Sequence, residues 1–483
     1  MNLARKLYNA GIGALNGTDE GTDKVYGVEC LLQAAAYGSA DAQCLLGQLY
    51  EKGDGLPQSD EEAARWYMRA ADAGHIDAQF YLAYCYKNGR GVEKDWNWFL
   101  YWLRQSVKGG SARACNVLGI CYREGLGTAV DFVAATTLFK EGAEMGHRDC
   151  MYAYGRSLFN GEGCKKSKSG AAKWYRNAAY VGHVAAQFEL ANMYFNGVGV
   201  KKSLKQAFTW YLFAGPLGHV KAMYKLGECY TYGYGTEVNL TEASLYFTMS
   251  AEKGNPEAAF RLWKIYRDAL GVEYDAEKAI LWLRKAAIMN HAEAQCVLAE
   301  CYRDGVCVVP DVNSAVFWFS RAAEAGVAEA QYCYAVALES GYCAAPDFAA
   351  AVVQYEAAAK QGHIRAMYNL GICYHYGRGV EVDLIKAVAY YKLDAEGGLA
   401  PAQFNLAVCY QEGIGGPANL EKCIQWYTAA AEQGYMKAQS NLAACYEKGE
   451  GVKKDLAKAR MWYEQAAAQG EDFAAAALLL LPK

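Results

Sequence analysis

The feature that most constrains this chain is a small residue that recurs every 36 residues without interruption. With Ala42 as position 1 of a unit, the same position falls on Ala78, Ala114, Cys150, Ala186, Ala222, Ala258, Ala294, Ala330, Ala366, Ala402, Ala438 and Ala474. A fixed period of this length is the sequence signature of a repeat array, in which each unit packs mainly on its two neighbours. The 483-residue chain is therefore predicted to form one elongated solenoid instead of several globular domains.

Each unit carries the start and stop signals of two helices. Helix A is predicted to span positions 1 to about 11, with apolar residues at positions 1, 5, 8 and 9 on one face. A glycine pair at positions 12 and 14, such as Gly53 and Gly55, ends it because glycine readily adopts positive φ. Helix B is predicted to begin after position 18, which is Ser, Asp or Asn in every full unit, and to end at Gly or Asn at position 33. The chain is thus predicted to be all-α, with about thirteen helix-turn-helix repeats.

Position 6 of helix A is Gly or Ala in every unit except one, where Trp263 stands. A small residue at a fixed place on a helix predicts the close approach of a neighbouring helix. Helix B carries bulky pairs such as Trp426 and Tyr427 followed by alanines, so large and small side chains are expected to interdigitate.

Charge and cysteine placement narrow the class of protein. The 48 basic and 52 acidic residues give a net charge of −4, so no nucleic-acid partner is expected. The N-terminal 17 residues lack the apolar stretch of a signal peptide, and the apolar segment 473–481 is too short to span a bilayer. Seven of the 17 cysteines stand at position 8, where stacked helices would hold them too far apart for disulfides. We therefore expect a cytoplasmic protein with reduced thiols and no membrane insertion.

Residues 402–435 show the repeat in representative form: Ala-Gln-Phe-Asn-Leu-Ala-Val-Cys-Tyr-Gln-Glu-Gly-Ile-Gly, followed by Trp-Tyr, alanines and a glycine. This pattern resembles the Sel-one-like repeat, a relative of the tetratricopeptide repeat, over nearly the whole chain. The resemblance implies a right-handed α/α superhelical solenoid that serves as a scaffold or adaptor in protein assemblies. It divides the chain into a degenerate N-terminal capping repeat at 1–41, twelve repeats at 42–473 and a C-terminal capping helix at 474–483.

The candidate binding residues lie on the side of helix A opposite the predicted core, which the superhelix would turn to its concave face. Position 3 on this side is aromatic in eight units, and aromatic rings supply contact area at low entropic cost. We expect these rings to line a binding groove; the alternative is that they pack against neighbouring helices. The rings are Phe80, Tyr152, Phe188, Tyr224, Phe260, Tyr332, Tyr368 and Phe404.

Positions flanking these rings vary from unit to unit, whereas the scaffold positions repeat, so we interpret the variation as recognition. The apolar flanking residues of the last third, suited to an apolar side chain, are Val336, Ile372 and Tyr376. The polar flanking residues, whose cations suit a carboxylate or phosphate, are Arg156, Asn192, Lys264, Arg267 and Arg303.

No catalytic or metal-binding motif stands apart from the repeat. Six histidines recur at position 34, just past helix B, where a cation would complement the helix dipole, and copies one unit apart are too distant to share a metal. Ser250 and Lys253 match the SxxK pattern of penicillin-recognising enzymes without its companion motifs. We therefore expect no catalytic residue, no metal and no cofactor.

The sequence predicts a non-enzymatic scaffold that binds a peptide or partner protein along the concave surface of helices A. One alternative is sequestration of a small molecule or nucleotide, such as a small anionic metabolite, by the rings and arginines. A second is a β-lactam-binding hydrolase, which secreted, cysteine-rich members of the resembled family imply. Two units depart from the pattern. Unit 258–293 has Trp263 and Ala269 at positions that are otherwise small or glycine, and unit 330–365 lacks the tyrosines and one glycine.

Overall fold

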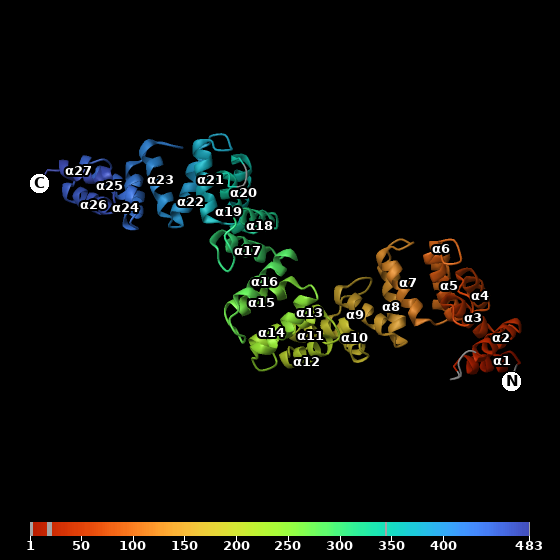
Figure 1. The fold of residues 1–483 in the computed structure, drawn as a ribbon. Coiled ribbons are helices and arrows are strands. Elements are labelled where there is room, and N and C mark those ends of the chain that lie inside the picture. The colour runs from red at the N-terminus through yellow and green to blue at the C-terminus, as the bar shows by residue number, and fades with distance from the viewer. Residues whose placement is uncertain (1–2, 17–21, 343–344, 483) are drawn as a thin grey trace. The chain divides into compact units, whose positions relative to one another are not determined.

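The computed structural model describes residues 3–16, 22–342 and 345–482. In these ranges all 27 regular elements are α-helices, which pair and stack in chain order (Figure 1). The predicted all-α solenoid of helix pairs is confirmed. The helices fall into two compact units, Met1–Tyr246 and Phe247–Lys483, whose boundary lies inside α14 (Leu240–Glu252).

The odd-numbered helices are the helices A. From α3 onward each begins two residues before position 1, slightly earlier than predicted. In the first unit they are α1 (Leu3–Leu15), α3 (Ala40–Lys52), α5 (Ile76–Asn88), α7 (Ala112–Glu124), α9 (Arg148–Asn160), α11 (Val184–Asn196) and α13 (Val220–Tyr232). In the second unit they are α15 (Pro256–Arg267), α17 (Ala292–Asp304), α19 (Ala328–Ser340), α21 (Ile364–Tyr376), α23 (Ala400–Glu412), α25 (Met436–Lys448) and α27 (Asp472–Leu480).

The even-numbered helices are the helices B, and their predicted start is confirmed. The side chain at position 18 accepts a backbone N–H of the first turn in all twelve units. Besides α14, these helices are α2 (Thr22–Ala36), α4 (Asp60–Asp72), α6 (Trp96–Lys108), α8 (Phe132–Glu144), α10 (Lys168–Tyr180), α12 (Leu204–Ala214), α16 (Ala276–Ile288), α18 (Val312–Glu324), α20 (Phe348–Lys360), α22 (Leu384–Glu396), α24 (Leu420–Glu432) and α26 (Leu456–Ala468).

Position 26 of helix B is aromatic in ten of the twelve units, the exceptions being Leu103 and Leu283, and its ring lies against the small residue at position 6 of the same repeat. A Cβ built on Gly47 would lie 2.6 Å from the ring of Tyr67, and one on Gly371 would lie 2.7 Å from the ring of Tyr391. Both rings are buried, with an exposed fraction of 1%. The predicted close approach of a helix at position 6 is therefore confirmed.

Consecutive repeats are joined by a hydrogen bond that explains the recurring Ala-Gln pair. The amide Nε2 of glutamine at position 2 donates to the carbonyl at position 30 of the preceding helix B, a carbonyl in the last turn of that helix. Gln79 donates to Ala71 over 3.2 Å, and Gln295 donates to Ala287 over 3.0 Å. Position 14 also lies in this junction, where a Cβ on Gly415 would come within 2.7 Å of the Leu384 carbonyl oxygen.

The histidines at position 34 begin the next helix A instead of closing helix B, so their predicted role was wrong. In each, ring Nδ1 accepts the N–H of position 1 over 3.1–3.4 Å. Ser39 and Ser111 make the same N-cap with their hydroxyls. An accepting Nδ1 carries no proton, so the cap needs a neutral ring, not a cation. The six capping histidines are His75, His147, His183, His219, His291 and His363.

These caps predict a loss of stability in mild acid. Burial lowers the pKa of His147, His183 and His219. A group whose pKa falls on folding stabilises the fold above its unfolded pKa of about 6.5, and this contribution is lost as the pH decreases further. Replacing all three with serine, the cap used at Ser39 and Ser111, should reduce the loss of unfolding free energy between pH 7.5 and 5 by roughly 1 kcal/mol per histidine. Urea unfolding at both pH values measures this difference, and an unchanged loss would contradict it.

A buried carboxyl group in α22 has the opposite pH dependence. Asp394 occupies position 29, where most repeats have alanine, such as Ala358 and Ala430. Its exposed fraction is 1%, and neither carboxyl oxygen has a hydrogen-bond partner among the described residues. Burial raises the pKa of Asp394 to about 7.

Replacing Asp394 with alanine should therefore stabilise the protein at neutral pH. Because the pKa rises on folding, the penalty of the charged form is absent below the unfolded pKa of about 4 and grows by about 1.4 kcal/mol per pH unit up to about pH 7. The difference in unfolding free energy between Asp394→Ala and the wild type should increase over this range and level off above it. A difference independent of pH would show that the buried carboxyl group does not control this stability.

Candidate binding surface

The aromatic side chains at position 3 are more buried than those of a fully exposed binding groove would be. Phe188 and Phe260 are buried, with exposed fractions of 9% and 4%, which fits the alternative that these rings pack against neighbouring helices. The other six are half-buried: Phe80, Tyr152, Tyr224, Tyr332, Tyr368 and Phe404. Tyr152, Tyr332 and Phe404 each lie against the position 26 ring and the position 34 residue. For Tyr332 the distances between ring centroids are 6.2 Å to Tyr355 and 4.8 Å to His363.

The hydroxyl of the position 26 tyrosine reaches the side of helix A that carries positions 7 and 10. Tyr67 donates to Glu51 over 2.8 Å, and Tyr355 donates to Glu339 over 2.9 Å. Tyr211 donates to the side-chain oxygen of Asn192 over 2.7 Å. Asn192, a predicted binding residue, is therefore engaged inside its own repeat.

The four predicted cations lie on this side of helices A, and acidic neighbours compensate two of them. Arg267 binds Asp268 through two hydrogen bonds of 2.7 and 2.8 Å, and these bonds lower the pKa of Asp268. Arg303 binds Asp304 in the same way over 2.8 and 2.9 Å. The compensation was readable in the sequence, because each aspartate directly follows its arginine.

The two remaining cations have looser contacts. Arg156 Nη2 lies 3.9 Å from Glu162, a separation at which pairing of half-exposed groups contributes little. Lys264 Nζ lies 4.5 Å from the ring centroid of Phe260, which stacks on Trp263. The middle of the surface thus carries mixed charge, with cations available beside aromatic rings.

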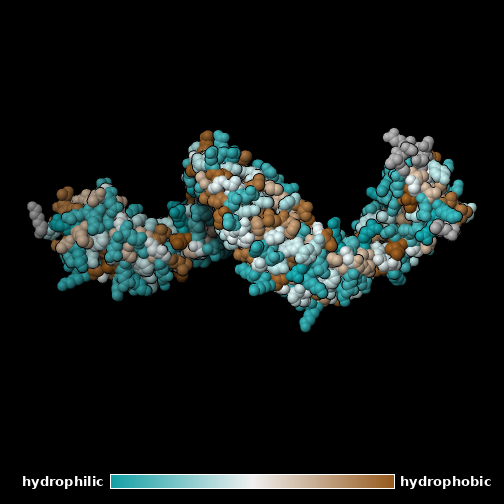
Figure 2. All heavy atoms as spheres, turned by 90° about the horizontal axis from the view of Figure 1, so that it is seen from below, coloured by the Kyte–Doolittle hydropathy of each residue, from teal (hydrophilic) through white to brown (hydrophobic). Residues whose placement is uncertain are grey.

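The predicted apolar third is only partly accessible. Val336 and Ile372 are half-buried, whereas Tyr376 is exposed with its ring stacked on His375 at 4.5 Å. The Tyr368 hydroxyl accepts a hydrogen bond from Asn405 over 3.2 Å. On the face drawn in Figure 2, hydrophilic side chains separate small groups of apolar ones.

Slots between consecutive repeats were not predicted. In the second unit, the Cys307 slot, of about 230 Å³, lies between the α15–α16 pair and α17 and is lined by Trp263, Ala276 and Cys307. The Cys333 slot, of about 420 Å³, is at the equivalent place one repeat later, between the α17–α18 pair and α19. Its lining includes three predicted residues, Arg303, Tyr332 and Val336.

A cysteine in place of a glycine accompanies the Cys307 slot. Position 14 is normally glycine, and Cys307 stands there with φ 59°. Its side chain lines the slot at the point where other repeats bring the loop against the preceding helix B. Burial raises the pKa of Cys301 to about 11 and that of Cys333 to about 12, so these two thiols in the slots are protonated at neutral pH.

The described ranges contain no group of three or more His, Cys, Asp or Glu side chains suited to a metal ion. Ser250 of the SxxK pattern is fully buried in α14, with an exposed fraction of 0%, which leaves it out of reach of a substrate. None of the helices in the described residues has the length and apolar character needed to cross a bilayer.

Solved structures with the same architecture are found in bacteria. A protective antigen of uropathogenic Escherichia coli, c5321, which displays an SLR fold, is 29% identical with a TM-score of 0.68, covering 94% of this chain and 97% of that chain. A Sel1 repeat protein from Oxalobacter formigenes is 27% identical with a TM-score of 0.52, covering 66% of this chain and 92% of that chain. No curated protein matches the sequence.

The Sel1 repeat family model matches more than half of the chain and leaves residues 328–363 unmatched. The matched segments are 40–75, 76–95, 112–147, 148–183, 184–219, 220–255, 256–291, 292–327, 364–399, 400–435 and 437–471. Most begin at the first residue of a helix A and end at the cap of the next. The chain therefore belongs to the Sel1 repeat family.

Proposed function

We propose that the protein is a non-enzymatic scaffold that binds a segment of a partner protein on the exposed side of helices A, around positions 3, 7 and 10. Sel1 repeat proteins typically serve as protein-interaction scaffolds. The observation that carries the proposal is that, among the repeats of this chain, the packing positions keep the same kind of residue whereas the surface positions differ. Positions 6 and 18 recur because they hold the repeat together, whereas positions 7 and 10 change from repeat to repeat.

The variable residues provide a graded surface for recognition. Lys264 and Arg267 project over the stacked rings of Phe260 and Trp263, at 4.5 and 4.4 Å from the respective ring centroids. Because both rings are buried, the charged ends and the aliphatic stems of the two cations are the parts that a partner would contact. A partner segment that combines acidic and apolar side chains would match this surface.

Removal of the cations should weaken partner binding without unfolding the scaffold. A random peptide library selected on the full chain supplies the binding partners, and the variant carries Arg156→Ala, Lys264→Ala, Arg267→Ala and Arg303→Ala. Because exposed ion pairs contribute only about 0–1 kcal/mol each, the thermal melt should change little. Affinity for the selected peptides should fall more than about tenfold, because loss of a single charge-assisted hydrogen bond already has an effect of this size. Fluorescence anisotropy measures the affinity.

A matched control removes four cations from helices B. Each control lysine lies above the position 9 tyrosine of its own repeat, at 4.9–5.6 Å from the ring centroid, so both variants lose four cation–ring contacts or surface charges. The control should bind the selected peptides like the wild type. Equal binding by both variants, or failure of the folded chain to select any peptide, would contradict the proposed surface. The control residues are Lys278, Lys386, Lys422 and Lys458.

A further inference from the structure

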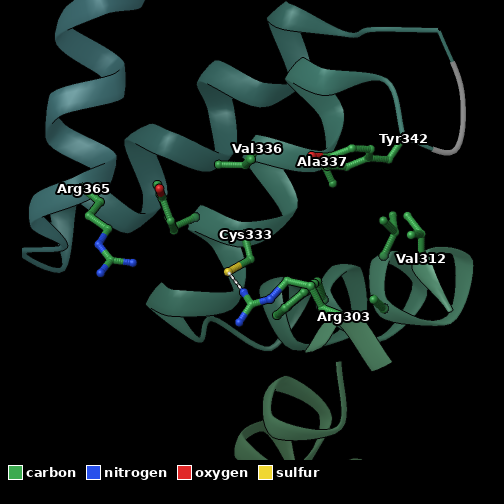
Figure 3. A pocket seen from close by; sticks show the side chains of 11 residues that line it. Arg303, Val312, Cys333, Val336, Ala337, Tyr342 and Arg365 are labelled. Atoms are coloured by element: carbon green, nitrogen blue, oxygen red, sulfur yellow. Dashed lines mark hydrogen bonds between the residues drawn. The ribbon is translucent and has the colours of Figure 1, made fainter. Parts of the chain in front are cut away.

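The Cys333 slot has a cationic end and an apolar end. In Figure 3 the guanidinium groups of Arg303 and Arg365 lie on one side of the drawn residues, and Val312 and Tyr342 lie on the other. Val336 and Ala337 of α19 lie between them. A cavity of about 420 Å³ falls within the roughly 300–1,000 Å³ range of small-ligand sites.

Both arginines retain donors for a ligand. Arg365 makes no side-chain hydrogen bond or ion pair with the described residues, unlike Arg113 at the same repeat position, which binds Asp77 over 2.7 Å. Arg303 uses Nε and Nη2 for Asp304, while its Nη1 is directed at Cys333 Sγ over 3.6 Å. A protonated thiol is a weak acceptor, so a carboxylate oxygen would be a much stronger partner for this Nη1.

Two acidic groups beside the slot, Asp304 and Glu329, are already paired, whereas Glu300 acts on Arg303 and Cys333 through its charge. Asp304 is bound to Arg303, and Glu329 lies 2.9 Å from His363 Nε2 and accepts from Cys333 over 3.6 Å. Burial disfavours the charged form of Glu329, but the hydrogen bonds from His363 and Cys333 and the charge of Arg365 outweigh it, so the pKa of Glu329 is lowered. Arg365 is therefore the cation of this slot that has no bonded acid among the described residues.

The slot is large because of local departures from the repeat. Position 8 is cysteine in seven repeats and isoleucine in one, Ile265, but it is alanine at Ala337. The position 9 tyrosine is replaced by Leu338 in the same helix. The family model leaves this repeat, 328–363, unmatched, so the enlargement of the slot accompanies a departure from the family pattern.

We propose that the Cys333 slot binds an apolar carboxylate, with the apolar group between Val312, Val336 and Tyr342 and the carboxylate at Arg365 and Arg303. A free carboxylic acid and the C-terminal residue of a polypeptide both present this chemistry. The inference goes beyond the scaffold function and does not depend on it, because a single ligand of this kind contacts only one junction between repeats.

Isothermal titration calorimetry with two pairs of probes tests the proposal on the full chain. One pair is 4-phenylbutanoate and its primary amide; the other is acetyl-Gly-Gly-Leu with a free or an amidated C-terminus. At least one free carboxylate should bind, and its amide should bind at least about tenfold more weakly, as expected for a lost charge-assisted hydrogen bond. Binding of only the small acid identifies a free acid as the ligand, and tighter binding of the peptide acid identifies a C-terminal residue.

Three variants distinguish the slot from nonspecific binding. Arg365→Gln should weaken binding at least about tenfold, whereas Arg113→Gln, at the same position of another repeat, should leave it unchanged. Ala337→Ile introduces the residue that α15 carries at position 8, so it should fold, fill the slot and abolish binding. Circular dichroism confirms that each variant is folded. The proposal is overturned if no free carboxylate binds, if the amides bind equally well, or if Arg365→Gln binds like the wild type.

Discussion

The architecture depends on the seating of an aromatic ring of helix B on a glycine or alanine of helix A within the same repeat. Gly47 with Tyr67 and Gly119 with Phe139 leave no room for a further carbon between them. Burial of each ring contributes about 2–3 kcal/mol, which a displaced helix would forfeit. The contact fixes the angle at which the two helices cross. The helical hairpin therefore has the same shape in each 36-residue repeat, and consecutive hairpins stack in the same way. In one repeat the large and the small residue of this contact are exchanged: helix A carries a buried Trp263, and helix B carries a buried Leu283.

Much of the fold could be predicted because its determinants are local. The position 18 caps, the glycines that end each helix and the left-handed Asn290 act within a few residues of themselves, so their spacing alone identifies them. The roles of Gln79 and His75 could not be predicted in this way. Gln79 acts across the junction between two helices, and the sequence shows only that it recurs, not which carbonyl it meets. His75 caps its own helix through the N–H of Ala78, a role that Ser, Thr, Asp and Asn usually fill.

The candidate surface was predicted less well than the fold, for a physical reason. Periodicity shows which side of helix A is turned from the core, but not how far side chains of neighbouring helices cover it. Phe260 is buried although it lies on the predicted side, because His291, which caps the next helix A, lies against its ring, at 4.5 Å between centroids. The Cys333 slot depends on the small side chain at Ala337, and its effect on the cavity is known only once the surrounding helices are placed.

Departures from the repeat are concentrated in the second unit. At these places the side chains pack less tightly or a buried polar group lacks a hydrogen bond. Cys307 adopts positive φ, Ala337 leaves space, and Asp394 places an unpartnered carboxyl group among apolar residues. A repeat array tolerates such changes because each repeat contacts mainly its neighbours, so a local loss does not spread. Recognition can therefore differ from repeat to repeat on a scaffold whose other contacts stay the same.

A double-mutant cycle at the contact between α21 and α22 tests the central claim most directly. Gly371→Trp and Tyr391→Leu are measured alone and together, which reproduces in this repeat the exchange seen at Trp263 and Leu283. If the ring and the small residue stabilise the hairpin as a complementary pair, each single substitution should lower the free energy of unfolding. The loss in the double variant should be at least about 1 kcal/mol smaller than the sum of the two single losses. Free energies of unfolding that add to within about 0.5 kcal/mol would contradict the account.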